Sequence, residues 1–151
     1  MKNILIKTVS TFFGIGYVPV APGSAASVVA GVMCFLLFNN MYLYIFVFFV
    51  VTICGFLISG KMEDIVKEKD PSCVVIDEVS GMMITFFMLP RTWPVLITAF
   101  FLFRAFDMFK IYPVSYFEKK PGGIGIMMDD VAAGLYANIV MQISLFIFRS
   151  N

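Results

Sequence analysis

The chain has 151 residues, so a single domain covering residues 1–151 is expected. Its residues are 60% hydrophobic and 14% charged, whereas an ordinary soluble domain is about 45–50% apolar and about 25% charged. This balance indicates a membrane protein, and the net charge of +1 gives no electrostatic support for a nucleic-acid partner.

The N-terminal part predicts a short interfacial helix and then a loop. Residues 1–13 mix apolar side chains with two lysines, which is typical of an amphipathic helix lying in a membrane interface. Residues 14–24 contain three glycines and two prolines, so a regular helix is not expected there. Ser24 is placed to N-cap the apolar segment that follows.

The apolar segments predict an all-α, polytopic membrane bundle of about four to five spans. Residues 41–59 run without a charge and are long enough to cross about 30 Å of hydrocarbon. Residues 60–72 are interpreted as a solvated linker, and residues 111–128 as a connecting stretch. The five predicted spans are roughly 22–38, 41–59, 75–90, 93–109 and 130–149.

Charge positions predict the orientation of this bundle. With five spans, Arg91 and Arg149 lie on one side of the membrane, and all the acids lie on or near the other side. The positive-inside rule then places the more basic side, and with it the predicted active site, in the cytoplasm. The nine cations on that side are Lys2, Lys7, Lys61, Lys67, Lys69, Arg104, Lys110, Lys119 and Lys120.

Three charged motifs would gather at this face. Asp77 and Glu78 start the third span, and acids so near a membrane usually face a cavity. Asp129 and Asp130 follow a glycine-rich turn at the expected start of the last helix. Taken singly, each motif has a simpler interpretation: an exposed interfacial pair, a salt-bridge ladder along one helix side, or helix-start capping. The third motif consists of Arg104, Asp107 and Lys110, which are spaced by three residues along one side of a helix. The glycines before Asp129, which could bring backbone N–H groups to an anion, are Gly122, Gly123 and Gly125.

The residue types select one kind of chemistry. The chain has no histidine, so His-based metal sites and phosphohistidine or Ser-His mechanisms are excluded. Oxygen ligands alone select a hard ion, and Mg²⁺ is the natural choice. The cysteine-phosphatase loop, the D-x-D signature and the P-loop are all missing from the sequence. Direct attack on a phosphate by a metal-activated water remains, with an acid as general base.

Four stretches together resemble the phosphatidylglycerophosphatase A family of bacterial membrane lipid phosphatases. They lie in the family order and cover about a third of the chain. Two departures are that Ile111 follows Lys110 where proline is common, and that Pro121 precedes the glycines. The matching stretches are TFFGIGYVPVAPGS (11–24), IDEVSG (76–81), FRAFDMFKIYP (103–113) and GGIGIMMDDVAAG (122–134).

The resemblance implies an all-helical, Mg²⁺-dependent enzyme of the bacterial inner membrane. Such an enzyme converts phosphatidylglycerophosphate to phosphatidylglycerol and inorganic phosphate. Arg104 and Lys110 match the basic motif positions, Gly23 and Ser24 match the first loop, and these residues are expected to bind the phosphate. The expected catalytic and metal-binding acids are Asp77, Glu78, Asp107, Asp129 and Asp130, with Asp129 or Asp130 as the base or principal ligand.

Two alternatives compete with this interpretation. A CDP-alcohol phosphotransferase also places aspartates at a membrane face, but its D-G-x-x-A-R…G…D-x-x-x-D signature is missing. A small ion transporter or channel subunit would place its acids in mid-span, whereas here the acids lie at span ends. The oligomeric state is not predicted.

Overall fold

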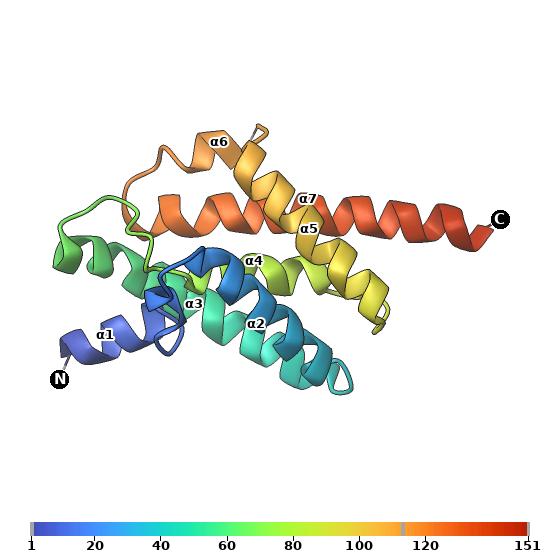
Figure 1. Cartoon of the computed structure of the whole chain (residues 1–151), viewed down its shortest axis with the longest axis horizontal. Coiled ribbons are helices and arrows are strands. Elements are labelled where there is room, and N and C mark those ends of the chain that lie inside the picture. The colour runs from blue at the N-terminus through green and yellow to red at the C-terminus, as the bar shows by residue number, and fades with distance from the viewer. Residues whose placement is uncertain (1, 113, 151) are drawn as a thin grey trace.

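The computed structural model describes residues 2–112 and 114–150, and within these ranges the chain is all-helical, as predicted. Seven α-helices and one 3-10 helix make up this described part (Figure 1). They are α1 (Lys2–Ser10), η1 (Ile15–Tyr17), α2 (Pro22–Leu37), α3 (Met41–Val66), α4 (Ile76–Phe86), α5 (Trp93–Phe109), α6 (Val114–Phe117) and α7 (Gly122–Ser150).

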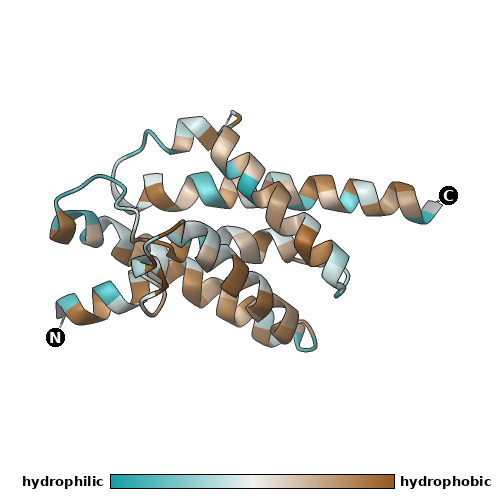
Figure 2. Ribbon diagram, viewed as in Figure 1, coloured by the Kyte–Doolittle hydropathy of each residue, from teal (hydrophilic) through white to brown (hydrophobic). Residues whose placement is uncertain are grey.

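Two helices, α3 and α7, are long and apolar enough to cross a membrane. The helix α2 is also apolar but shorter. Figure 2 shows hydrophobic residues along most of the length of α2, α3 and α7. By length and composition, the structure therefore does not confirm the predicted four to five spans. Numerous large apolar side chains face outward, among them Phe46, Ile53 and Phe146, which suits a membrane setting.

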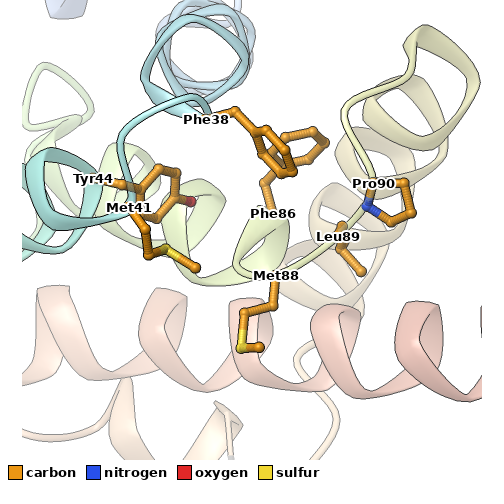
Figure 3. Close-up of a pocket in the computed structure, with 7 residues that line it drawn as sticks. All are labelled: Phe38, Met41, Tyr44, Phe86, Met88, Leu89 and Pro90. Atoms are coloured by element: carbon orange, nitrogen blue, oxygen red, sulfur yellow. The ribbon is translucent and has the colours of Figure 1, made fainter.

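The bundle has two distinct ends. Figure 1 places the loop between α3 and α4, the short α6 and the start of α7 at the left, and the α2–α3 and α4–α5 turns at the right. An apolar cavity of about 290 Å³ lies at the end with the two turns, where Phe38, Tyr44, Phe86 and Pro90 help to line it (Figure 3). At the same end, the Arg91 guanidinium lies 4.6 Å from the Phe35 ring centroid and donates a hydrogen bond to Asn39.

The helix α4 is the core of the bundle and crosses α7 at unusually close range. A Cβ on Gly134 would overlap the carbonyl oxygen of Gly81, and a Cβ on Gly81 would lie 2.8 Å from the carbonyl oxygen of Asp130. Both positions therefore need glycine for the backbones to touch. Glycines at a helix crossing allow this kind of approach in membrane bundles.

The C-terminal end of α4 is held by polar side chains of α7. The Asn138 amide donates to the carbonyls of Thr85, at 2.9 Å, and Phe87, at 2.8 Å. The last carbonyls of a helix have no partner within the helix, and leaving them unpaired in an apolar setting is costly. Asn138 therefore allows α4 to end after eleven residues, inside the bundle.

Three predictions about the ends of helices are wrong. The helix α2 begins at Pro22, as the predicted span 22–38 does, but its N-cap is Ala21, so the predicted N-cap Ser24 lies inside the first turn; proline is favoured at such a start. The helix α3 continues through the good helix formers Lys61, Met62 and Glu63 to Val66, so only the rest of the predicted linker is a loop. The helix α7 begins at Gly122, not near residue 130.

The early start of α7 follows from its packing on α3. A Cβ on Gly123 would lie 2.6 Å from the Phe56 carbonyl oxygen, and one on Gly60 would lie 2.9 Å from the Gly123 nitrogen. The glycines that suggest a turn in the sequence are thus needed for a close helix contact. As a result, Asp129 and Asp130 lie about two turns inside α7, away from its N-terminal dipole.

We expect Gly134→Ala to destabilise the fold by about 1–3 kcal/mol, the usual cost of overpacking a tight contact. The new methyl group would push α7 away from Gly81 of α4. Thermal unfolding in detergent measures the effect, and Ile143→Ala, at a side chain 55% exposed on the same helix, is the matched control. An unchanged unfolding temperature for Gly134→Ala would contradict the described crossing.

We expect Asn138→Leu to lower stability by about 0.6–2 kcal/mol, since the Thr85 carbonyl loses the Asn138 donor and the Phe87 carbonyl keeps only the longer bond from Gln142. The same unfolding assay applies. Ser144→Ala is the control, because the Ser144 hydroxyl bonds only to Val140 within its own helix. Equal effects of the two substitutions would argue against a specific role for Asn138.

Candidate functional site

A polar cavity of about 320 Å³ lies at the end of the bundle opposite the cavity of Figure 3. Five segments far apart in the sequence meet there: the start of α2, the loop before α4, the first turn of α4, the end of α5 and the third turn of α7. The lining residues are Ala21, Pro22, Gly23, Ser24, Asp70, Ser72, Val74, Asp77, Glu78, Arg104, Asp107, Lys110, Asp129 and Asp130.

Three carboxylates form the deepest cluster, here called the acid triad: Asp77, Glu78 and Asp130. One oxygen from each lies within 4.8 Å of the others, and Asp77 and Asp130 are only 7% and 3% exposed. Asp77 Oδ1 and Glu78 Oε2 are buried and have no hydrogen-bond partner within the described residues. Buried charges of one sign are costly unless a counter-charge reaches them. The triad therefore has the oxygen donors and the electrostatic need that suit a hard divalent cation.

Gly23 makes room for this cluster. A Cβ at that position would overlap Glu78 Oε1 and lie 2.9 Å from the carboxyl carbon Cδ. The first turn of α2 can therefore press against the Glu78 carboxylate only because residue 23 has no side chain. The sequence predicted Gly23 as a phosphate-binding residue, and the structure places it against an acid.

Arg104 and Lys110 line the cavity from the end of α5, and each already has a carboxylate partner. Arg104 Nη1 lies 2.8 Å from Asp107 Oδ2, which is the salt bridge of the simpler interpretation, while the buried Nε of Arg104 has no partner in the described chain. Lys110 Nζ lies 2.7 Å from Glu118 and 3.8 Å from Asp129. Burial alone would lower the pKa of Lys110, but the carboxylates of Glu118, Asp129 and Asp107 outweigh it and raise that pKa. Lys110 is therefore a permanent cation at the cavity.

The two adjacent acids of α7 point to different neighbours. Asp130 belongs to the acid triad, whereas Asp129 faces Lys110 and accepts the backbone N–H of Asp130 at 3.0 Å. Adjacent residues on a helix diverge by about 100°, which explains the separation. The cavity can therefore give the two acids different roles.

Acidic groups outnumber basic groups in the cavity. Six acids line it against two cations, Arg104 and Lys110, so four negative charges are uncompensated if every group is ionised (6 − 2 = 4). A negatively charged phosphate would be repelled from such a cavity without additional cations. This excess is the strongest physical indication of a metal-assisted site.

The predicted glycines Gly122, Gly123 and Gly125 do not line the cavity. Gly123 packs on α3, and Gly125 packs against the carbonyl oxygen of Lys120. Their positions support helix packing and give no support to the predicted contact with phosphate.

The sequence interpretation missed Asp70, Ser72 and Glu118. The first two lie in the loop before α4 that was interpreted as a solvated linker. Glu63 of α3 accepts the Asp70 N–H at 2.9 Å, and Ser10 of α1 accepts the Val75 N–H at 3.0 Å, so both sides of the loop are anchored. The one available signal was the short distance along the chain between this loop and Asp77.

The arrangement combines oxygen ligands for a hard cation with two basic groups that suit phosphate oxygens. It can hold a phosphate beside a metal at the edge of an apolar bundle. Phosphoryl transfer in other enzymes depends on these same components.

Comparison with known proteins agrees with this chemistry. The family model described as Phosphatidylglycerophosphatase A matches residues 8–145. The chain is 33% identical to Phosphatidylglycerophosphatase A of Haemophilus influenzae, and the match covers 90% of this chain and 86% of the relative. It is also 33% identical to Phosphatidylglycerophosphatase A of Escherichia coli K12, over 82% of this chain and 73% of that relative. A Bacteroides thetaiotaomicron protein, whose name marks it as a candidate phosphatidylinositol-3-phosphatase, is 37% identical over 96% of both chains. No solved structure matches the chain. Because the family model matches nearly the whole sequence, the chain belongs to the phosphatidylglycerophosphatase A family.

Proposed function

We propose that this protein removes the terminal phosphate of phosphatidylglycerophosphate and releases phosphatidylglycerol and inorganic phosphate, with Mg²⁺ as cofactor. The observation that supports it best is the polar cavity, where an acid triad with unpaired oxygens lies beside Arg104 and Lys110. Family membership and the names of two relatives support the lipid substrate.

The residues divide into a metal side and a phosphate side. Asp77, Glu78 and Asp130 would hold Mg²⁺, which when bound supplies positive charge to phosphate oxygens and makes a water molecule more acidic. The free Nε of Arg104 and the ammonium of Lys110 bind phosphate oxygens. Asp107 orients the Arg104 guanidinium through their 2.8 Å contact and lines the same cavity as the acid triad.

Asp129 is the best candidate for the general base. It lies in the cavity outside the acid triad, so it can accept a proton from the attacking water. The water oxygen then bonds to phosphorus, the ester P–O bond breaks and the glycerol oxygen takes up a proton. Lys110, beside Asp129, stabilises the negative charge that develops on the phosphate.

The proposed setting is the bacterial cytoplasmic membrane, with several passes and the cavity facing the cytoplasm. The excess of cations predicted for the cavity side supports this orientation through the positive-inside rule. The outward-facing apolar side chains and the two long apolar helices support the membrane location.

One observation favours a second substrate. The Bacteroides relative is 37% identical to this chain, and its name points to a phosphate on an inositol lipid. Both lipids present a phosphate monoester on a polyol attached to a diacylglycerol unit, so the same cavity chemistry would serve either. Assays should therefore include phosphatidylinositol 3-phosphate beside phosphatidylglycerophosphate.

The channel alternative loses support from the hydrogen bonds of the mid-span polar residues. Thr52 bonds to Ser80, Thr85 and Ser144 bond to backbone carbonyls, and Asn138 and Gln142 donate to the end of α4. Thr98 likewise donates to the Pro94 carbonyl. These groups already have protein partners, so they are poorly suited to line an ion path.

We expect purified protein to release phosphate from phosphatidylglycerophosphate in Mg²⁺ and to lose this activity in EDTA. Asp130→Asn should lower kcat by about 100-fold or more, because the acid triad loses one charged ligand. Asp64→Asn, an exposed acid on α3 away from the cavity, is the matched control and should retain activity. Full activity in EDTA, or in Asp130→Asn, would contradict the proposed mechanism.

We also expect Gly23→Ala to reduce activity by roughly 10–100-fold, because the new methyl group displaces the Glu78 carboxylate. The double variant Gly23→Ala with Glu78→Asp should recover part of the loss, since the shorter acid leaves room for the methyl group. Steady-state phosphate release measures both variants, beside Glu78→Asp alone. If the shorter acid lowers the activity of Gly23→Ala further, the steric explanation is wrong.

A further inference from the structure

An apolar groove runs between α2 and α5 on the outside of the bundle. It encloses about 240 Å³, with Val28 and Val32 on one wall, Ile97 and Phe101 on the other, and the buried Met82 of α4 at its base. The four wall residues are 41–65% exposed, so the groove is open to whatever surrounds the protein. Gly31 deepens it, because a Cβ there would come within 3.1 Å of Leu96.

The groove begins one helical turn from the polar cavity on both walls. On α2, Ser24 lines the cavity and Ser27 and Val28 line the groove; on α5, Arg104 lines the cavity and Phe101 lines the groove. From there α2 runs away from the cavity while α5 approaches it, so the groove continues toward Trp93 at the far end. The span from Trp93 to Phe101 is about 12 Å along α5.

The side chains that line the groove are apolar except for Ser27 and the indole N–H of Trp93 at the far end. Trp93 is 58% exposed, so its N–H does not depend on an occupant of the groove for a partner. Ser27, the one hydroxyl residue of the lining, is buried and donates to the Gly23 carbonyl at 2.8 Å. An occupant of the groove therefore needs no hydrogen-bonding groups of its own. A hydrocarbon chain meets this condition, and its burial is favourable by about 0.8 kcal/mol per methylene.

The other apolar cavities lack this continuity. The cavity of Figure 3 lies against the turns at the opposite end of the bundle, as the labelled Phe38 and Pro90 show. The cavity between α3, α4 and α7 is lined by Phe48, Phe87 and Leu135 and has no residue within a turn of the acid triad. Only the α2–α5 groove, among the cavities described, leads directly into the polar site.

We propose that the α2–α5 groove binds one acyl chain of the lipid substrate while its phosphate occupies the polar cavity. The inference rests on the proposed function, since it requires a substrate whose terminal phosphate is linked to acyl chains through a glycerol, a phosphodiester and a second glycerol. This linker would lie between Ser24 and Arg104, at the boundary of the two regions. The groove would thus select for lipid substrates over their water-soluble headgroups.

The kinetic test compares phosphatidylglycerophosphate bearing long acyl chains with its diacetyl analogue. Ile97→Trp should fill the groove and lower kcat/KM for the long-chain lipid by about tenfold, the effect of losing about two buried methylenes. Its kcat/KM for the diacetyl analogue should stay within about twofold of the wild type. The control Val29→Trp, an exposed residue of α2 outside the groove, should change neither value. Equal losses on both substrates for Ile97→Trp would overturn the proposal.

A binding test separates this proposal from the proposed function. The long-chain lipid, with a photoactivatable diazirine in one acyl chain, is cross-linked in Mg²⁺ to the Asp129→Asn variant, which lacks the proposed general base and is not expected to turn the lipid over. Labelled peptides should come from α2 and α5, and Ile97→Trp should reduce the labelling. Label confined to α3 and α7, or cross-links between two copies of the chain across the groove, would overturn the acyl-chain assignment. Labelling of the groove, with no phosphate released by the wild-type protein in a parallel assay with Mg²⁺, would instead retain the groove and refute the proposed activity.

Discussion

The close crossing of α4 and α7 is the constraint on which the rest of the structure depends. Asp77 lies four residues before Gly81 on α4, and Asp130 lies four residues before Gly134 on α7. Both helices start at the same end of the bundle, so contact between the two glycines holds the two acids side by side one turn away. The acid triad is thus a consequence of helix packing, and any widening of the crossing would separate its members.

This packing brings together carboxylates that repel one another, and the nearby cations do not resolve the conflict. Arg104 is engaged by Asp107, and Lys110 by Glu118, so neither is wholly available to the triad. The same engagement holds the two cations in place at the cavity wall. The acid triad therefore suits a bound cation, whereas Arg104 and Lys110 suit a bound anion. A metal ion together with a phosphate would complement both regions.

The sequence was sufficient to predict that the acid pairs share one end of an all-helical bundle. That prediction followed from the sidedness of the charges and from acids placed at the ends of apolar segments. The helix start of α7 could not be predicted in this way, because Gly122 and Gly123 favour a turn locally and become helical through their contact with α3. Tertiary packing overrides local propensity at this point.

The missed residues show a second limit of sequence reasoning. Asp70 and Glu118 lie in polar segments without periodicity, where a lone acid is most often solvated. Their approach to the cavity depends on backbone contacts from other elements, such as the hydrogen bond from the Asp70 N–H to Glu63. No spacing rule links residues 63, 70 and 118, so only the folded structure reveals them.

The short α4 explains how a charged site can exist within so apolar a bundle. Eleven residues extend about 16 Å, roughly half the hydrocarbon thickness of a bilayer, and nine of the eleven are buried. The neighbouring helices enclose α4, so Asp77 and Glu78 at its start are shielded from lipid. At its other end, Asn138 donates hydrogen bonds to the last backbone carbonyls. That shielding leaves the lipid tails outside the helices that surround the acids. In the proposed function, the phosphate would therefore enter at the end of the bundle while its attached hydrocarbon stays on the outer surface, which requires a site and a groove that meet at an edge. The start of α2 and the end of α5 form that edge.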